Sequence, residues 1–160
     1  MSSGPLENTV ALVTGASSGI GEATARRFVA EGAAVALLAR RRDRIEALAA
    51  ELKQAGGRAL AIECDVTDQA QAEAAVQQTV DQLGRLDTVF NNAGVMLLGA
   101  IQDAPISEWD RMIDVNIKGL LYVAHASLPY LLAAPEDTGL GARSHLPRAS
   151  APQWRKTFTP

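Results

Sequence analysis

The sequence has little of what marks a disulfide-bonded or metal-bound protein. Its 160 residues include one cysteine, Cys64, and two histidines, His125 and His145. A single cysteine excludes an internal disulfide framework and a cysteine-rich zinc site, and it fits a reducing compartment. The histidines lie in unrelated surroundings without metal-ligand spacing, so no metal is expected. Aromatic residues make up only 4% of the chain, so the core must be mostly aliphatic.

Long apolar runs and a strongly basic composition are also missing. No uncharged apolar stretch reaches the roughly 18 residues that a membrane span requires. The first residues lack the basic region and apolar run of a signal peptide. The net charge is −3 and the pI about 5.4, whereas a nucleic-acid binder is usually basic. These absences predict a cytoplasmic protein that binds neither membranes nor nucleic acid.

What is present is a regular alternation of two patterns. With 48% hydrophobic residues, the chain is large enough for one domain. Short apolar runs typical of buried strands cover 10–13, 35–39, 59–62 and 86–90. Helical periodicity covers 19–31, 41–55, 68–83 and 107–132. This alternation is typical of right-handed βαβ units, so we expect an α/β fold: a doubly wound parallel sheet with helices on both faces.

The last expected helix carries an apolar stripe and one polar residue within it. Ser107 is its expected N-cap. The stripe consists of Trp109, Met112, Ile113, Leu120, Ala124, Leu128 and Leu131. Asn116 falls inside the stripe, and a buried amide must find hydrogen-bond partners or cost stability. Asn116 is therefore either a satisfied polar group of the core or part of a functional site.

The composition changes after residue 134. Residues 1–134 carry 11 Lys and Arg against 16 Asp and Glu, whereas residues 135–160 carry four against two. The second segment also holds four of the seven prolines and shows neither helical nor strand periodicity. We therefore expect one domain over 1–134 and an irregular or disordered tail over 135–160.

The strongest local motif is Thr-Gly-Ala-Ser-Ser-Gly-Ile-Gly over 14–21. It follows the first expected strand and opens the first expected helix. Glycines at 15, 19 and 21 allow a tight turn and a close approach of backbone to a ligand, and the helix start offers free N–H groups to a pyrophosphate. A plain tight turn is the alternative, but the strand–turn–helix context favours dinucleotide binding.

This motif resembles the short-chain dehydrogenase/reductase family, classical type. Three further motifs agree with it in order: Asp65-Val66 after the third strand, Asn91-Asn92-Ala93-Gly94 after the fourth, and Asn116 within 114–119. The resemblance runs over 8–132. It implies a three-layer Rossmann-type sheet with strand order 3-2-1-4, cut after the fourth strand and its following helix. It also implies an NAD(P)-dependent oxidoreductase that moves hydride between the cofactor and a small carbonyl or alcohol substrate.

The resemblance assigns roles to individual residues. Those implied in holding the pyrophosphate and ribose are Gly15, Ser17, Ser18, Gly19, Ile20 and Gly21. Those implied on the adenine are Asp65 and Val66. Those implied on the ribose side and in the central sheet are Asn91, Ala93 and Gly94. Asn116 corresponds to the asparagine of the family's catalytic tetrad, which shapes its helix and holds a water in the proton relay.

The residues after the second strand indicate which cofactor is used. An acidic residue at this place binds the ribose 2′-hydroxyl of NAD. Here Ala39 is followed by Arg40, Arg41 and Arg42, and cations without the acid suit a 2′-phosphate. We therefore expect NADP rather than NAD, with Arg40 as the leading candidate for the phosphate. The alternative is a solvated basic start to the second helix.

Three catalytic residues of the family have no counterpart in this sequence. The family's reaction uses a serine and a Tyr-x-x-x-Lys pair, which lie on a fifth strand and the helix after it. Tyr122 is followed four residues later by Ala126, and Tyr130 by Ala134. We therefore expect the chain to be inactive alone, through a reading-frame shift near codons 132–135, a truncated gene model or a genuinely shortened family member.

The sequence is compatible with two functions. The first is a short-chain oxidoreductase whose front half is seen here. The second is a non-catalytic dinucleotide-binding or interaction module. For either, the resemblance implies self-association through the 107–132 helix, and the fourth strand is expected to form an unprotected edge of the sheet.

Overall fold

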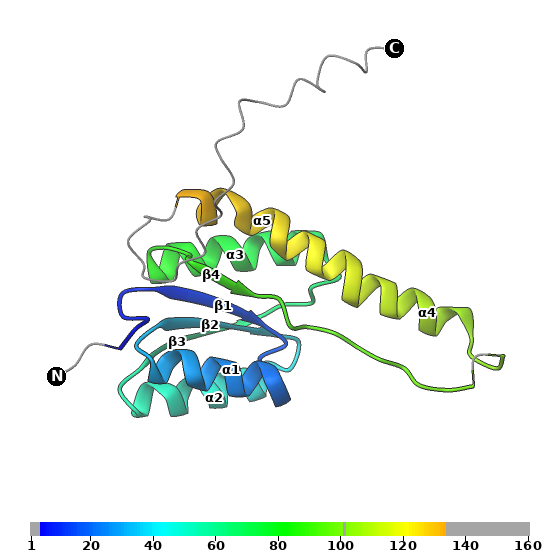
Figure 1. The fold of residues 1–160 in the computed structure, drawn as a ribbon, viewed down its shortest axis with the longest axis horizontal. Coiled ribbons are helices and arrows are strands. Elements are labelled where there is room, and N and C mark those ends of the chain that lie inside the picture. The colour runs from blue at the N-terminus through cyan, green and yellow to red at the C-terminus, as the bar shows by residue number, and fades with distance from the viewer. Residues whose placement is uncertain (1–3, 101, 134–160) are drawn as a thin grey trace, which may run out of the picture.

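The computed structural model describes residues 4–100 and 102–133 (Figure 1). The expected tail over 135–160 therefore lies outside the described residues. The strands are β1 (Val10–Thr14), β2 (Ala34–Ala39), β3 (Arg58–Glu63) and β4 (Thr88–Phe90). The helices are α1 (Gly19–Ala30), α2 (Arg42–Gln54), α3 (Gln69–Leu83), α4 (Ile106–Ile113), the π-helix η1 (Asp114–Gly119) and α5 (Leu120–Ala133).

The strands form one parallel sheet in the order β3-β2-β1-β4. Ala11 pairs with Val35 of β2 on one side and with Thr88 of β4 on the other. Helices α1 and α2 cover one face of the sheet, and α3 and α5 cover the other (Figure 1). The predicted α/β class, the three layers and the strand order 3-2-1-4 are confirmed.

Two cores lie on the two faces of the sheet because successive strand residues point to opposite faces. On β1 and β2, Val13 and Leu37 pack towards α1 and α2, while Leu12 and Leu38 pack towards α3 and α5. All four side chains are fully buried. β1 and β2 are buried along their whole length because both faces of the sheet are covered, and for this reason they appear in the sequence as nearly continuous apolar runs.

The expected helix over 68–83 corresponds to α3, whereas the expected N-cap of the last helix does not fit α4. Asp68 is the N-cap of α3, and its Oδ1 accepts a hydrogen bond from the Gln71 N–H at 3.1 Å. The prediction of Ser107 as the N-cap of the last helix is wrong, because α4 begins at Ile106 directly after Pro105. The proline ring fixes φ at −66°, and with ψ at 142° this residue is extended, so the helix begins one residue earlier than Ser107.

The expected single helix over 107–132 is a continuous run of α4, η1 and α5, and its apolar stripe is not the buried face. Ile113, Leu120 and Leu128 are 50%, 43% and 49% exposed. The buried residues of this run are instead Gly119, Val123 and Ser127. Val123 packs in one core with the α3 residues Ala72 and Val76. A Cβ on Gly119 would overlap the Val66 side chain, so contact with neighbouring elements decides which face is buried.

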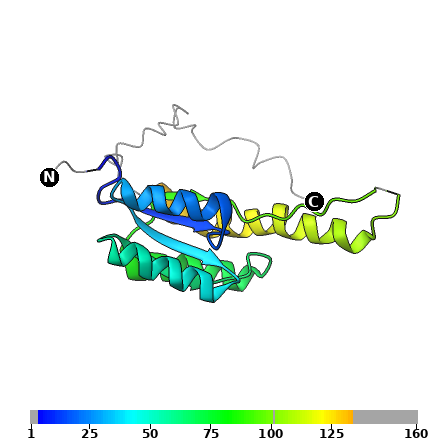
Figure 2. The same ribbon diagram turned by 90° about the horizontal axis from the view of Figure 1, so that it is seen from below.

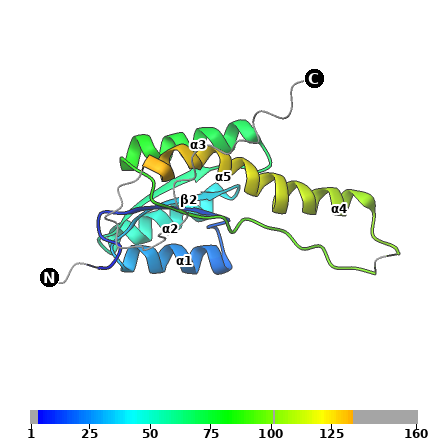
Figure 3. The ribbon, with the colours of Figure 1, turned by 45° about the horizontal axis from the view of Figure 1, so that its top comes forward.

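The outer part of this helical run extends past the sheet. Figures 1 and 2 show α4 and the loop before it projecting beyond the strands, whereas Figure 3 shows α5 lying beside α3. Ile106, Trp109 and Ile113 of α4 are accordingly exposed. In the part of the chain that the structure describes, no helix is long and apolar enough to cross a membrane.

Candidate dinucleotide site

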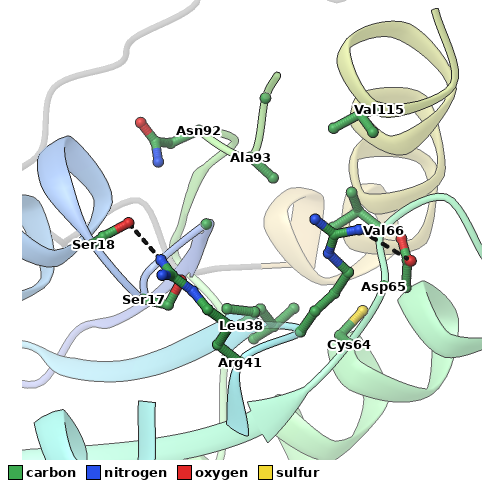
Figure 4. Close-up of a pocket in the computed structure, with 14 residues that line it drawn as sticks. Ser17, Ser18, Leu38, Arg41, Cys64, Asp65, Val66, Asn92, Ala93 and Val115 are labelled. Carbon is green, nitrogen blue, oxygen red and sulfur yellow. Dashed lines mark hydrogen bonds and ion pairs between the residues drawn. The ribbon is translucent and has the colours of Figure 1, made fainter. Parts of the chain in front are cut away.

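A hollow of about 340 Å³ opens at the carboxyl ends of the strands. In open parallel sheets this edge binds ligands, at the point where the strand order reverses, which here is between β1 and β4. Its walls come from the loops after all four strands and from η1 (Figure 4). The lining residues are Gly15, Ser17, Ser18, Leu38, Ala39, Arg40, Arg41, Cys64, Asp65, Val66, Asn92, Ala93, Gly94 and Val115.

The glycine-rich turn forms the wall between β1 and α1. Gly15 has a φ of +66°, which favours glycine. A Cβ on Gly21 would overlap the carbonyl oxygen of Gly15 and lie 2.7 Å from Asn92 Nδ2. Around Gly19, by contrast, a Cβ would meet nothing within 4 Å. The turn is therefore packed tightly against the neighbouring loop on one side and open on the other, where backbone can approach a ligand.

The start of α1 offers its backbone donors at the same wall. Ser18 is the N-cap with an extended backbone, and its side chain makes no capping hydrogen bond. The first N–H groups of a helix have no partner within the helix, and they carry the positive end of its dipole. This arrangement suits an anionic group such as a pyrophosphate.

Thr14, at the end of β1, is hydrogen-bonded to the loop that follows β4. Its buried hydroxyl accepts hydrogen bonds from the backbone N–H groups of Asn92 and Ala93, both at 2.9 Å, and donates to Asn91 Oδ1 at 3.4 Å. Asn92 Nδ2 donates to the Thr14 carbonyl at 3.2 Å. Sequence reasoning named neither Thr14 nor Asn92 as a site residue, although both belong to motifs that it singled out.

Five of the residues assigned by resemblance do not line the hollow: Gly19, Ile20, Gly21, Asn91 and Asn116. The Ile20 side chain is 71% exposed. Asn91 Nδ2 donates to the Leu120 carbonyl at 3.1 Å, which joins the end of β4 to the start of α5. Ser17, Asp65, Val66 and the other assigned residues do line it.

Asn116 lies in η1, half-buried behind the hollow. Its Oδ1 accepts a hydrogen bond from the Val95 N–H at 2.8 Å, and its Nδ2 donates to the Val95 carbonyl at 2.8 Å. A Cβ on Gly94 would lie 3.2 Å from the same Oδ1. The amide is thus satisfied by the loop that follows β4, in close contact with a residue that lines the hollow.

The three arginines after β2 take different directions. Arg41 crosses the mouth of the hollow and donates to Ser17 Oγ at 3.0 Å and Ser18 Oγ at 2.7 Å (Figure 4). Arg40 lines the hollow and forms an ion pair with Asp65 at 3.9 Å. Arg42 pairs with Glu46 on its own helix at 2.7 Å. The sequence pointed to Arg40, and the structure adds Arg41, which a run of arginines by itself cannot single out.

The floor of the hollow includes the chain's one cysteine. The Cys64 side chain is almost fully buried, and burial, helped by nearby Asp65 and Asp68, raises the pKa of its thiol to about 11. The thiol is therefore protonated at neutral pH and is a small apolar surface rather than a nucleophile. Among the described residues, no group of three or more His, Cys, Asp or Glu could hold a metal ion.

Fold and site together define an α/β dinucleotide-binding protein of the Rossmann type. The family model of the short chain dehydrogenases matches residues 9–139, and the chain belongs to this family. The family implies a nicotinamide dinucleotide, NAD(P), as cofactor.

Relatives of known sequence support this membership. The chain is 40% identical over 126 residues to the meso-2,3-butanediol dehydrogenase of Serratia marcescens. This alignment covers 79% of this chain and 49% of that enzyme. It is 39% identical over 155 residues to the glycine betaine reductase ATRR of Emericella nidulans, covering 97% of this chain and 12% of the reductase. The second alignment therefore runs past residue 134, into the segment that the composition sets apart.

Solved structures show the same relation. A short-chain dehydrogenase/reductase mutant from Serratia marcescens is 41% identical with a TM-score of 0.76, and the match covers 79% of this chain and 52% of that one. A short chain dehydrogenase from Mycobacterium smegmatis is 37% identical with a TM-score of 0.76, over 81% of this chain and 54% of that one. The chain spans about half the length of these dehydrogenases.

Proposed function

We propose that this chain is the cofactor-binding part of a short-chain oxidoreductase that uses NADP(H) and acts on a small carbonyl or alcohol substrate. The observation that carries the proposal is one hollow lined both by Ser18, the N-cap at the start of α1, and by Arg40 and Arg41. The first can take a pyrophosphate and the second a further phosphate.

The residues present fit a dinucleotide. The open side of Gly19 and the N–H groups of the first turn of α1 would hold the pyrophosphate. Val66, Val115 and the protonated Cys64 give apolar surface on which an adenine ring would lie. When bound, the nicotinamide supplies or accepts the hydride.

The choice of NADP rests on charge at the end of β2. Ala39 stands where NAD-binding proteins of this fold carry an acid for the ribose 2′-hydroxyl, and no carboxylate replaces it on β2. Arg41 already holds two hydroxyl groups at the mouth of the hollow, and guanidinium groups pair well with phosphate. Both features favour a cofactor with a 2′-phosphate.

Titration calorimetry of the 160-residue chain with NADPH and NADH tests this proposal. NADPH is expected to bind more tightly, and Arg41→Gln and Arg40→Gln are each expected to weaken NADPH by about tenfold with little effect on NADH, since each removes a charged hydrogen-bond donor. Arg42→Gln is the matched control because Arg42 pairs with Glu46 instead. Equal affinity for both cofactors would overturn the NADP assignment, and absence of binding would overturn the whole proposal.

A non-catalytic dinucleotide-binding module is the second candidate, and the positions of the tyrosines favour it for this chain. Tyr130 donates to Gln77 Oε1 at 2.6 Å, and Tyr122 packs against the core beneath α5. Neither lines the hollow, and the sequence contains no Tyr-x-x-x-Lys. Nicotinamide absorbance with simple ketones and alcohols separates the candidates: binding without turnover supports the module, and turnover supports the oxidoreductase.

The exposed apolar side chains of α4, η1 and α5 support self-association as part of this proposal. Ile113, Ile117 and Leu121 are each at least half exposed, and they follow one another at helical spacing. Such a row on the surface is typical of an interface. We expect a second copy of the chain to cover it.

A further inference from the structure

Arg40 and Asp65 stand at the wall shared by two hollows. The first is the candidate dinucleotide site, and the second, of about 320 Å³, lies between the loop after β3 and the helix α4 with η1. Both residues line both hollows. They form an ion pair, with Arg40 Nη1 3.9 Å from Asp65 Oδ2. Figure 4 marks this pair by the dashed line that ends at Asp65.

The two partners are held very differently. Asp65 Oδ1 accepts hydrogen bonds from the Thr67 N–H at 3.0 Å and from the Thr67 hydroxyl at 2.8 Å. The Asp65 N–H in turn donates to Gln71 Oε1 at 3.0 Å. Arg40, by contrast, has a side chain that is 63% exposed and meets the carboxylate only through the long ion pair. The carboxylate is fixed, and the guanidinium is the partner that can move.

We propose that Asp65 is a positioning residue that engages Arg40 in an ion pair and so limits the preference for NADPH over NADH. This inference rests on the proposed function and deepens it. A phosphate bound by Arg40 must compete with the Asp65 carboxylate for the same guanidinium. NADH, which has no 2′-phosphate, meets no such competition.

A contact between Asp65 and the adenine would behave differently. Both cofactors carry the same adenine, so a lost adenine contact weakens NADH and NADPH alike. The ratio of their two dissociation constants therefore separates positioning of Arg40 from direct binding of the base. Because Arg40 and Asp65 are partly exposed, the effect of positioning on this ratio is also expected to shrink at high salt.

The decisive variant is Asp65→Asn, which removes the charge but keeps an oxygen that can accept the hydrogen bonds from Thr67. We expect it to raise the preference for NADPH about two- to fivefold at low salt, the range that an exposed ion pair supports. In the Arg40→Gln background the same substitution is expected to leave the ratio unchanged. Glu73→Gln on α3 is the control, since it removes one carboxylate that pairs with Gln69 away from both hollows.

Calorimetric titration of the full chain with each cofactor measures these ratios, and circular dichroism checks the fold. If Asp65→Asn does not fold, Asp65→Ser, whose hydroxyl can also accept from Thr67, takes its place. The inference is overturned if Asp65→Asn changes the dissociation constants of NADH and NADPH equally, or if it raises the NADPH preference by the same factor in the Arg40→Gln background. Either result leaves the proposed function standing. A wild-type chain that binds neither cofactor overturns both.

Discussion

The side-chain amide of Asn116 makes both of its hydrogen bonds with the backbone of one residue, Val95, each at 2.8 Å. Asn116 lies in the π-helix between α4 and α5, and Val95 lies in the loop after β4. One side chain therefore fixes the position of that loop, whose preceding residues Ala93 and Gly94 line the candidate site. π-Helical turns often occur at functional sites, and here the turn carries the residue that holds the loop.

Replacing Asn116 by alanine is expected to lower the free energy of unfolding by about 1–3 kcal/mol, because two partly buried backbone groups of Val95 lose their partner. Urea denaturation measures the loss. Lys118→Ala is the control on the same turn, since its ion pair with Asp114 is exposed and is expected to contribute little to stability. Equal losses in the two variants would contradict a special role for Asn116.

Gly21→Ala is expected to destabilise the chain by about 1–3 kcal/mol and to weaken dinucleotide binding, because the new Cβ would overlap the Gly15 carbonyl and force the turn to move. Gly99→Ala is the matched control, since a Cβ there meets nothing within 4 Å. Thermal melting and cofactor titration follow the two effects. The close packing of the turn would be disproved by a Gly21→Ala chain that melts and binds like wild type.

The raised pKa of Cys64 makes stability depend on pH. The folded thiol keeps its proton up to about 11, whereas the unfolded thiol loses it near its ordinary value of 9.0. Between these values the unfolded state binds fewer protons, so the free energy of unfolding falls as the pH rises. We expect Cys64→Ala to show a shallower fall than wild type in urea denaturation between about pH 8 and about pH 10.5. If the free energy of unfolding falls equally steeply with pH in both proteins, the pKa of the folded Cys64 thiol is not raised.

The same shift predicts slow chemistry at the thiol. Because this is the only cysteine of the chain, one reagent reports on one position. Iodoacetamide at neutral pH should label the folded chain far more slowly than the urea-unfolded chain, since the thiolate is the reactive form. Rapid labelling of the folded chain would show that Cys64 is open and ionised.

Exposed apolar residues on η1 and α5 predict self-association. Ile117→Lys and Leu121→Lys should shift the chain towards monomer in sedimentation velocity, because a charge cannot be buried in the contact without a partner. Glu73→Lys on α3 alters an exposed position away from this row and should leave the distribution unchanged. A wild-type chain that is monomeric at high concentration would refute the prediction.

Much of the fold could be predicted because local pattern and tertiary structure agree. The apolar runs become strands since both faces of the sheet are covered, and the glycine motif over 14–21 becomes the turn between β1 and α1. The expected helix over 68–83 is found as α3, with Asp68 as its N-cap. Ser107 failed as a cap because Pro105, two residues earlier, already sets the backbone for the helix start.

The candidate site was predicted only in outline. The motifs gave the loops that surround the hollow, but the direction of each side chain depends on neighbours that are distant in sequence. Arg41 meets Ser17 and Ser18 across the end of the sheet, at a separation of more than twenty residues. Thr14 binds the loop after β4 at a still larger separation. The periodicity of a single helix or strand cannot predict contacts between residues so far apart in the sequence.

The sequence by itself determined the parallel α/β class and the place of the glycine turn, because these follow from short-range pattern and from the handedness of βαβ units. The strand order came from the family resemblance that its motifs carry. Only the tertiary structure decided which face of the last helical run is buried. The apolar residues favoured one face, but the buried residues are Gly119, Val123 and Ser127. Val123 packs in the core shared with α3, and Gly119 lies against the Val66 side chain. Close packing between helices depends on how the side chains of both helices fit together, and the sequence pattern of one helix does not describe that fit.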